Sequence, residues 1–424
     1  MGALSDYITD KCLSMPNIIR ELKRVCHNDI PYVNDLSTFT TTDIPRELKE
    51  YMLHFAEMNL AISHVAYPSI LEMHDYCINF IANLWYAPRN EKDNSQFFGI
   101  STIGSSEACI MAGVSMLYHW KKRNQHRLHC DIKPNLIVSA AFQVCWKKFA
   151  DLFDVELRQI PITNTFYTMQ VDHIEAAIDD HTIGIVSIFA NTQAGLYDDT
   201  KAIDDLIEDN NKRFDRKVTI HVDAASGGFF APFIQPEILF DFRLKNVVSV
   251  NASGHKFGLT PPSIGWLVFR SEEYLSESLK NELDYLGGGV LKDVGFNFSK
   301  SAMPLAAQYF LFKTLGLSGY EALISSADKV SKYIENEINN IPQLKVLAKG
   351  DISTVIYTVD NHCKVDIHKL EEHLRDMYRW QVPTYELPNT GIYIHRVVVR
   401  TDFTMEMARN FIDTLKIAIA SLDK

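Results

Sequence analysis

Short runs of β-branched residues alternate with amphipathic helical stretches between about residues 134 and 270. The runs are PNLIVSAA, VELRQI, IGIVSIFA, KVTIHVDAA, VVSVNAS and IGWLVF. Apolar residues at helical spacing lie between them, as at Ile203, Leu206 and Ile207. This alternation predicts βα units in a mostly parallel sheet that is covered by helices on both faces.

The pattern changes after about residue 300. A long helical pattern through residues 320–338 is followed by the run STVIYTV, another helical stretch, the run GIYIHRVVV and a final helix. This order predicts a separate, smaller α+β domain. Because no repeat or low-complexity linker marks a boundary, the pattern alone divides the chain into an N-terminal segment (1–40), a large domain (41–300) and a small C-terminal domain (301–424).

Composition narrows the class of protein. The chain has 424 residues, of which 46% are apolar and 22% charged, as is typical of globular proteins. Its net charge of −11 argues against nucleic acid as a partner. Seven cysteines without C-x-x-C pairs favour reduced thiols in the cytoplasm, and their spacing predicts no metal site. We find no signal peptide and no membrane-spanning stretch, so no membrane partner is expected.

Lys256 is the first candidate for chemistry. It follows a strongly apolar predicted strand, in the turn of SVNASGHKFG, and ligands of α/β sheets bind at the carboxyl ends of the strands. Such a lysine is either a solvated surface charge or, in a partly desolvated site, a nucleophile that forms a Schiff base.

Asp223 ends the preceding predicted strand, in KVTIHVDAASGG. It could cap a helix or form a salt bridge, or it could hold its negative charge against the nitrogen of a pyridinium ring and keep that nitrogen protonated. Small residues after it, including Ala225, leave room for a flat ligand.

A third element is the predicted helix that begins after Gly104 in STIGSSEACIMAGVSMLYHWKKR. Hydroxyls at the start and basic residues at the end match the helix dipole. One serine there would be a plain N-cap, whereas the adjacent hydroxyls of Ser105 and Ser106 are typical of a phosphate site.

The motifs STIGSSEA, HVDAASGGFFAPF, NASGHKFG and DYLGG together resemble the group II pyridoxal-phosphate decarboxylases, and most closely the glutamate decarboxylases. The resemblance runs from about Asp35 to the end of the chain. It implies an α/β fold of the aspartate-aminotransferase (type I) class, pyridoxal 5′-phosphate as cofactor, and α-decarboxylation of an acidic amino acid.

The resemblance also implies residue roles. Lys256 would carry the cofactor as a Schiff base beside His255, and Tyr285, in a glycine-rich lid, would help to return a proton. The other implied cofactor contacts are Asp223 at the ring nitrogen with Ala225 next to it, Gln143 on the ring, Thr192 near the ring hydroxyl, Ser105, Ser106 and Ser253 at the phosphate, and Ser299 at the phosphate of a neighbouring subunit.

The substrate residues implied by the resemblance are Thr38, Phe39, Asn59 and Arg396. The acidic residue expected three positions after Asn59 is absent, because Ile62 stands there. Glutamate giving 4-aminobutyrate is the first hypothesis, because most motif positions favour it. Aspartate giving β-alanine is the alternative, because the acidic residue is missing. A different enzyme class on the same fold, and a non-catalytic relative, are the remaining alternatives.

The resemblance further implies a homodimer with shared active sites. The N-terminal segment is short, and the tail lacks the regulatory histidine of the acid-resistance enzymes, so a hexamer and pH-gated self-inhibition are not expected. Three other features favour plain structural roles: His221 as a core hydrogen-bonding residue, and Cys109 and Cys145 as small buried hydrophobic residues.

Overall fold

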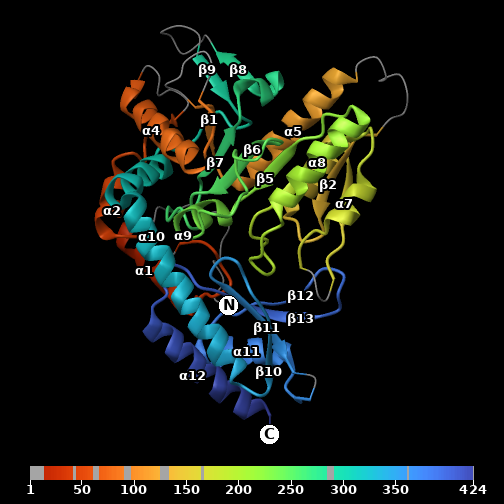
Figure 1. Cartoon of the computed structure of the whole chain (residues 1–424). Helices are drawn as coiled ribbons and strands as arrows, with labels where there is room; N and C mark the ends of the chain where they lie inside the picture. The colour runs from red at the N-terminus through yellow and green to blue at the C-terminus, as the bar shows by residue number, and fades with distance from the viewer. Residues whose placement is uncertain are drawn as a thin grey trace.

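The computed structural model describes residues 14–41, 44–60, 66–89, 97–124, 133–163, 167–283, 291–360 and 362–423. A seven-stranded sheet with helices on both faces forms the upper part of the molecule, and a four-stranded sheet with helices forms the lower part (Figure 1). This arrangement confirms the predicted α/β fold with a smaller α+β unit.

The large sheet has the strand order β1-β7-β6-β5-β4-β2-β3. Neighbouring strands from β3 to β6 are parallel, while β7 is antiparallel to β6 and β1 antiparallel to β7. The six predicted runs all form strands, and β1 is an edge strand that the sequence pattern did not indicate. The bounds are β1 (Gly99–Thr102), β2 (Asn135–Ser139), β3 (Glu156–Ile160), β4 (Thr182–Ile188), β5 (Ile220–Asp223), β6 (Val247–Ser253) and β7 (Gly265–Phe269).

Both faces of the sheet are buried at β2, β4, β6 and β7, which explains their largely apolar sequences, whereas on the edge strand β3 only Ile160 is buried. On β2, Leu136 and Val138 pack on one side with α5 and α6, whereas Ile137 between them packs on the other with α7 and α8. The helices around the sheet are α4 (Pro68–Leu84), α5 (Ser105–Arg123), α6 (Val144–Phe153), α7 (Val171–Ala177), α8 (Thr200–Phe214) and the short α9 (Ala231–Ile234).

The smaller sheet is wholly antiparallel, in the order β10-β11-β13-β12. Its strands β11 and β13 are the two runs predicted after residue 300, while β10 and β12 were not predicted. The bounds are β10 (Leu344–Lys349), β11 (Thr354–Val359), β12 (Thr384–Glu386) and β13 (Tyr393–Val398), with α11 (Ile367–Tyr378) and α12 (Met405–Leu422). Strands β8 (Lys280–Leu283) and β9 (Leu291–Val294) form a separate pair.

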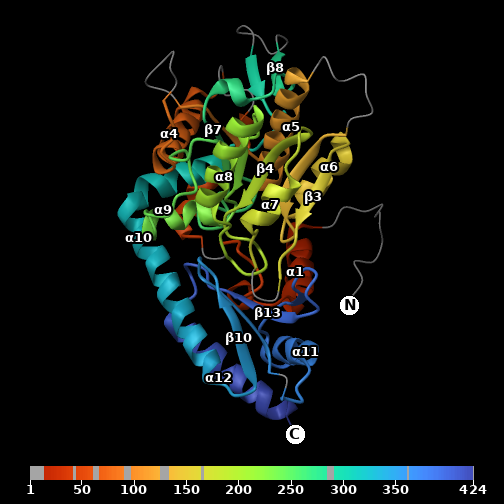
Figure 2. The ribbon, with the colours of Figure 1, turned by 45° about the vertical axis from the view of Figure 1, so that its right-hand side comes forward.

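Helix α10 (Met303–Asn339) runs from the large unit into the small one, as both ribbon views show (Figures 1 and 2). Its buried side chains up to Ile324 belong to the core of the large sheet, and those from Ala327 onward belong to the core of the small sheet. Within it, Gly316 has a φ of 56° and a ψ of −164°, where the helix is kinked. The predicted domain boundaries at residues 40 and 300 stay predictions.

The remaining elements are at the N-terminal end and in connections. Segment 35–37 lies against the small sheet. Leu36 packs in the core of that sheet, its amide donates a hydrogen bond to the Gln381 carbonyl, and its carbonyl accepts one from the Val398 amide. The bounds are α1 (Met15–Val25), α2 (Arg46–Leu53), and the 3-10 turns η1 (Cys26–Asn28), η2 (Tyr32–Asn34), η5 (Gly227–Phe229), η6 (Glu272–Tyr274) and η7 (Glu277–Leu279).

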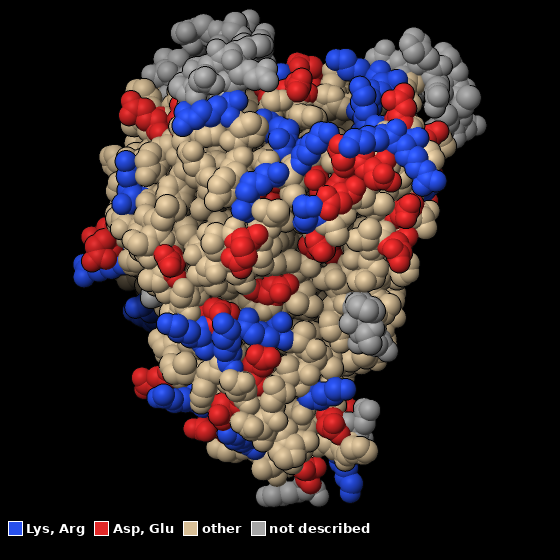
Figure 3. Space-filling view, viewed as in Figure 1, with Lys and Arg blue, Asp and Glu red and all other residues tan. Residues whose placement is uncertain are grey.

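On the face seen in Figure 3, acidic and basic side chains are mixed. Across the parts of the chain that the structure describes, no helix combines the length and the apolar character that crossing a membrane requires.

Candidate active site

A cavity of about 770 Å³ lies at the carboxyl ends of β5 and β6, where the topology of an α/β sheet places ligand sites. Its walls come from both units, because β13 and the segment 37–40 also contribute. It brings together most of the predicted site residues: Thr38, Phe39, Ser105, Ser106, Gln143, Thr192, Asp223, Ala225, Ser253, His255, Lys256 and Arg396.

Lys256 lies in the turn that follows β6, and its amine donates a hydrogen bond to the Ser226 hydroxyl at 3.0 Å. Burial lowers the pKa of Lys256; Asp223 opposes this effect, and Arg396 adds to it. A lowered pKa increases the fraction of neutral amine, which is the nucleophilic form. The backbone of the turn is fixed by a hydrogen bond from the Thr41 amide to the His255 carbonyl, at 2.9 Å.

Asp223 is the last residue of β5 and is only 3% exposed. One carboxylate oxygen accepts a hydrogen bond from the Trp146 indole at 3.0 Å, and the other has longer contacts with the Ala225 amide (3.3 Å) and the Asn251 amide group (3.4 Å). Among the described residues no lysine or arginine forms an ion pair with this carboxylate. A buried carboxylate of this kind suits a cationic ligand group, such as a protonated ring nitrogen.

The predicted phosphate residues meet at the start of α5. The hydroxyls of Ser105 and Ser253, which come from α5 and β6, are 2.8 Å apart. Gly104 is the N-cap residue, so the free backbone amides of the first helical turn lie next to these hydroxyls. Hydroxyl donors and helix amides together fit a phosphate group.

Close packing fixes this turn. A Cβ atom on Gly265, at the start of β7, would lie 2.5 Å from the carbonyl carbon of Gly104. Gly265 therefore allows the strand to approach the backbone that presents Ser105.

Gln143 and Thr192 face each other across the cavity wall, with the Gln143 amide donating to the Thr192 hydroxyl. Gln143 is the residue immediately before α6. Their contact agrees with the prediction that both lie near one flat ligand.

Arg396 of β13 is 7% exposed, so it is a buried residue and not an exposed strand arginine. Its guanidinium lies between the rings of Phe39 (5.0 Å) and Tyr385 (5.4 Å). The terminal nitrogens donate to the Thr192 and Ser37 carbonyls, while Nε is buried without a partner. Both terminal nitrogens of the guanidinium are therefore engaged by backbone carbonyls of the described chain, which the sequence did not indicate.

His255 also presents an unpaired atom, since its Nδ1 is buried without a hydrogen-bond partner. Burial, with a contribution from Lys256, lowers the pKa of His255 to about 4. The ring is therefore neutral near pH 7, and within the described part of the chain its buried Nδ1 has no hydrogen-bond partner.

Two predicted residues are outside the cavity wall. The Asn59 side chain contacts the Ser299 hydroxyl at 3.4 Å and accepts from the Lys300 amide at 3.1 Å. Neither Asn59 nor Ser299 lines the cavity within one chain. Tyr285 and Ile62 lie outside the described residues.

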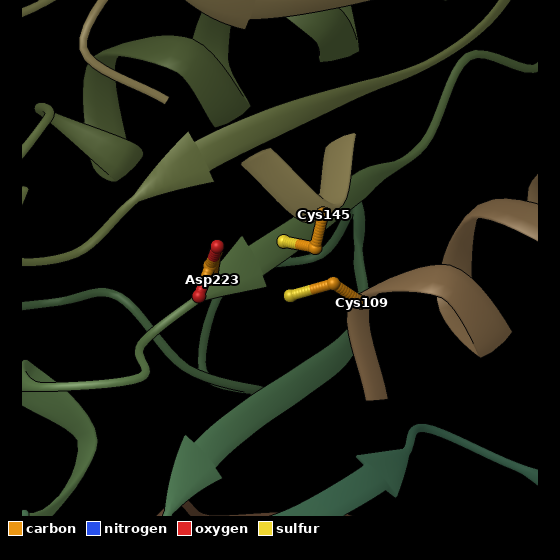
Figure 4. Close-up of side chains that lie close together, drawn as sticks. All are labelled: Cys109, Cys145 and Asp223. Carbon is orange, nitrogen blue, oxygen red and sulfur yellow. The ribbon is translucent and has the colours of Figure 1, made fainter. Parts of the chain in front are cut away.

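Several residues at the site were missed by the sequence reasoning. Ser226 and Trp146 contact the two key side chains, and their only sequence signals are that Ser226 follows Asp223 closely and Trp146 is one helical turn after Gln143. Cys109 and Cys145 are buried, as predicted, but they also line the cavity and point toward Asp223 (Figure 4).

His221 has the predicted core role. Its two ring nitrogens lie 2.8 Å from the Ser249 hydroxyl and 2.8 Å from the Asn251 side-chain oxygen. Because Asn251 also contacts Asp223, His221 supports the carboxylate indirectly.

Comparisons with known proteins agree with this geometry. The family model described as the pyridoxal-dependent decarboxylase conserved domain matches residues 11–360. The chain is 42% identical over 398 residues to a glutamate decarboxylase of Lactococcus lactis, covering 92% of this chain and 84% of that protein. It is 39% identical over 397 residues to glutamate decarboxylase beta of Listeria monocytogenes, with 92% and 84% covered.

Comparison with solved structures also gives a glutamate decarboxylase. A Lactobacillus brevis glutamate decarboxylase superposes with a TM-score of 0.92 at 39% identity, covering 100% of this chain and 96% of that one. A sphingosine-1-phosphate lyase of Burkholderia pseudomallei, at 21% identity and a TM-score of 0.82, shares the fold. Since the family model spans most of the chain and the similarity to curated members extends beyond it, the chain belongs to the pyridoxal-dependent decarboxylases.

Proposed function

We propose that the protein holds pyridoxal 5′-phosphate in the cavity at Lys256 and Asp223 and catalyses α-decarboxylation of L-glutamate to 4-aminobutyrate and carbon dioxide. The observation that carries the proposal is the meeting of three groups in one cavity: a lysine of lowered pKa, a buried carboxylate that forms no ion pair with the described residues, and a pair of serine hydroxyls at a helix start.

Each group has a part to perform in this proposal. Ser105, Ser253 and the first amides of α5 bind the phosphate, and Asp223 accepts a hydrogen bond from the ring nitrogen. The bound cofactor supplies a positively charged ring that takes up the electrons released when the carboxylate leaves the substrate. Lys256 is the amine that holds the cofactor and is freed for proton transfer during turnover.

The substrate is held by donors of the small unit. Arg396, with its unpartnered Nε, and Thr38 lie on the cavity wall. Because the protein has a net charge of −11 and glutamate is an anion, such local donors must outweigh an unfavourable long-range field. The glutamate decarboxylases named above support glutamate as the substrate. Aspartate stays the second candidate, because Ile62 replaces the expected acidic residue.

The experiment is product analysis by mass spectrometry after the holoenzyme is incubated separately with glutamate, aspartate and cysteine sulfinate. We expect 4-aminobutyrate to form much faster than β-alanine. Exclusive formation of β-alanine would show that aspartate, and not glutamate, is the substrate. If none of the three acids gave an amine product, the decarboxylase proposal would be refuted. The Lys256→Ala variant should lose both bound cofactor and product, whereas Lys329→Ala, at an exposed position of α10, should keep both.

We also propose that two copies of the chain form a homodimer with shared active sites. Asn59 and Ser299 lie off the cavity wall of their own chain, as expected of residues that serve a neighbouring subunit. Helix α1 supports this, because its apolar stripe is entirely exposed: Met15, Ile18, Ile19, Leu22 and Val25. Such a stripe needs a partner surface.

A further inference from the structure

Two thiols and a carboxylate converge at the inner wall of the cavity: Cys109 of α5, Cys145 of α6 and Asp223 of β5. Their ligand atoms all lie within 4.8 Å of one another. Both sulfur atoms point toward the carboxylate (Figure 4). The three residues are 1%, 3% and 3% exposed, and all of them line the cavity. The proposed decarboxylation uses Asp223 but gives the two thiols no role.

The chemistry of this group is that of a zinc site. Thiolate sulfur and carboxylate oxygen are both zinc ligands. Ligand atoms of a tetrahedral site lie about 3.8 Å apart when zinc–sulfur bonds are about 2.3 Å, so side-chain movements of about 1 Å bring the three atoms into position. Because all three residues line the cavity, a fourth ligand would reach the metal from that side.

The existing hydrogen bonds leave the ligand atoms available. The Cys109 thiol donates a long contact, 3.7 Å, to the Asn251 oxygen, and its other interactions are with Cys145 and Asp223, the two other members of the group. One oxygen of Asp223 accepts from Trp146, and the other has only contacts of 3.3 Å and 3.4 Å. The carboxylate is therefore fixed in place, with an oxygen free to bind a cation.

We propose that the protein without its cofactor binds one zinc ion through Cys109, Cys145 and Asp223. Binding forms two zinc–sulfur bonds and one zinc–oxygen bond and releases the two thiol protons to solvent, with no change of oxidation state.

Zinc and pyridoxal phosphate exclude each other in this inference, a point that rests on the proposed function. Zinc would bind the same carboxylate of Asp223 that would accept a hydrogen bond from the ring nitrogen. The positive charge of the zinc ion would also repel the positive charge of the protonated ring. Zinc thus acts as a competitor of cofactor loading, and the cofactor as a competitor of zinc.

The test is titration of the reduced, cofactor-free protein with Co²⁺, a spectroscopic probe for tetrahedral thiolate sites. We expect one Co²⁺ per chain with thiolate-to-cobalt charge-transfer absorption, and displacement of that absorption by Zn²⁺. Protein whose cofactor is locked on by borohydride should take up none. The variants Cys109→Ser and Cys145→Ser should weaken Co²⁺ binding by a factor of at least about 10, since even changes behind metal ligands cost that much.

The matched control is Cys363→Ser, which removes a partly exposed thiol of the small unit and should bind Co²⁺ unchanged. Absence of thiolate absorption in the unmodified cofactor-free protein overturns the inference, as does equal uptake by the locked protein. If a cysteine variant does not fold, the Co²⁺ uptake of the cofactor-free protein, compared with that of the borohydride-reduced protein, still tests the proposed site. Cofactor binding and decarboxylation are measured separately, so failure of the zinc site is distinguishable from failure of the proposed function.

Discussion

At the scale of single residues, the site depends on charges that are kept out of water. Asp223 is buried without a lysine or arginine ion pair in the described part of the chain, and Lys256 is buried with a lowered pKa. Burying either charge alone is costly, so the arrangement favours a ligand that is negative at one end and positive at the other.

The first prediction concerns Asp223→Asn. A hydrogen bond to a charged group contributes about 1.5–3 kcal/mol, so we expect kcat/KM to fall by a factor of about 10 to 150. The rate is measured with glutamate under saturating cofactor. Trp146→Phe, which removes the indole donor at 3.0 Å and part of the buried ring but keeps the carboxylate, should cost less. An Asp223→Asn enzyme with unchanged kcat/KM would contradict the role of the charge.

At the scale of elements, the turn from β1 into α5 presents the phosphate donors. Its position depends on Gly265 of β7, where a Cβ atom would collide with the Gly104 backbone. The site is thus set by the packing of a strand against a helix start, and not by the serines alone.

The second prediction is that Gly265→Ala weakens cofactor binding. Displacing Ser105 removes a hydrogen bond to a charged phosphate, so the Kd for pyridoxal phosphate should increase by a factor of about 10 or more. Equilibrium titration of the cofactor-free protein measures this change. Ser105→Ala should have an effect of similar size. If the Kd were unchanged in both variants, the phosphate would not bind at the start of α5.

A third prediction concerns the kink in α10. Gly316 has a backbone conformation that side-chain-bearing residues rarely adopt, although a Cβ atom added there would have no neighbour within 4 Å among the described residues. Gly316→Ala should therefore lower the free energy of unfolding by about 1–3 kcal/mol through backbone strain. Urea denaturation gives the value, and Leu317→Ala, at a 60% exposed neighbour, is the control. Equal free energies of unfolding for the two variants would show that a side chain at position 316 causes no backbone strain.

At the scale of the whole molecule, buried histidines link stability to pH. Burial lowers the pKa of His255 and of His395 to about 4. Both rings stay neutral in the folded protein while they take up protons in the unfolded chain below about pH 6.5. Their contribution to stability is complete above pH 6.5 and is lost as the pH falls toward 4. Asp198 acts in the opposite direction, because burial raises its pKa to about 6.

The fourth prediction follows from these shifts. Between pH 7 and pH 5 each of the two histidines should cost about 2 kcal/mol of folding free energy, and Asp198 should restore about 1 kcal/mol. Urea denaturation at both pH values measures the net loss. His395→Gln should reduce the difference between the two pH values, and equal stability at pH 5 and pH 7 would contradict the prediction.

The fifth prediction concerns assembly. Leu22→Glu puts a charge in the exposed apolar stripe of α1 and should shift the homodimer toward monomer. Light scattering after gel filtration measures the mass. Lys23→Glu, outside the stripe, should leave the dimer intact. If both variants stay dimeric, the interface does not involve α1.

The sequence predicted the large sheet well because most of its strands are buried on both faces and are therefore largely apolar. It missed β1, β10 and β12, which are short or lie at sheet edges, where burial is incomplete. The cavity residues on motifs were predicted through resemblance to a family. Contacts such as Trp146 with Asp223 depend on side chains from distant elements, and no local pattern in the sequence encodes them.

Helix α10 contributes side chains to both hydrophobic cores. Neither core can therefore melt completely without removing packing from the other, so heat should unfold the molecule in one calorimetric transition. For the same reason, a protease cut within this helix would leave both fragments with apolar surface exposed, and neither fragment would be a self-sufficient folding unit.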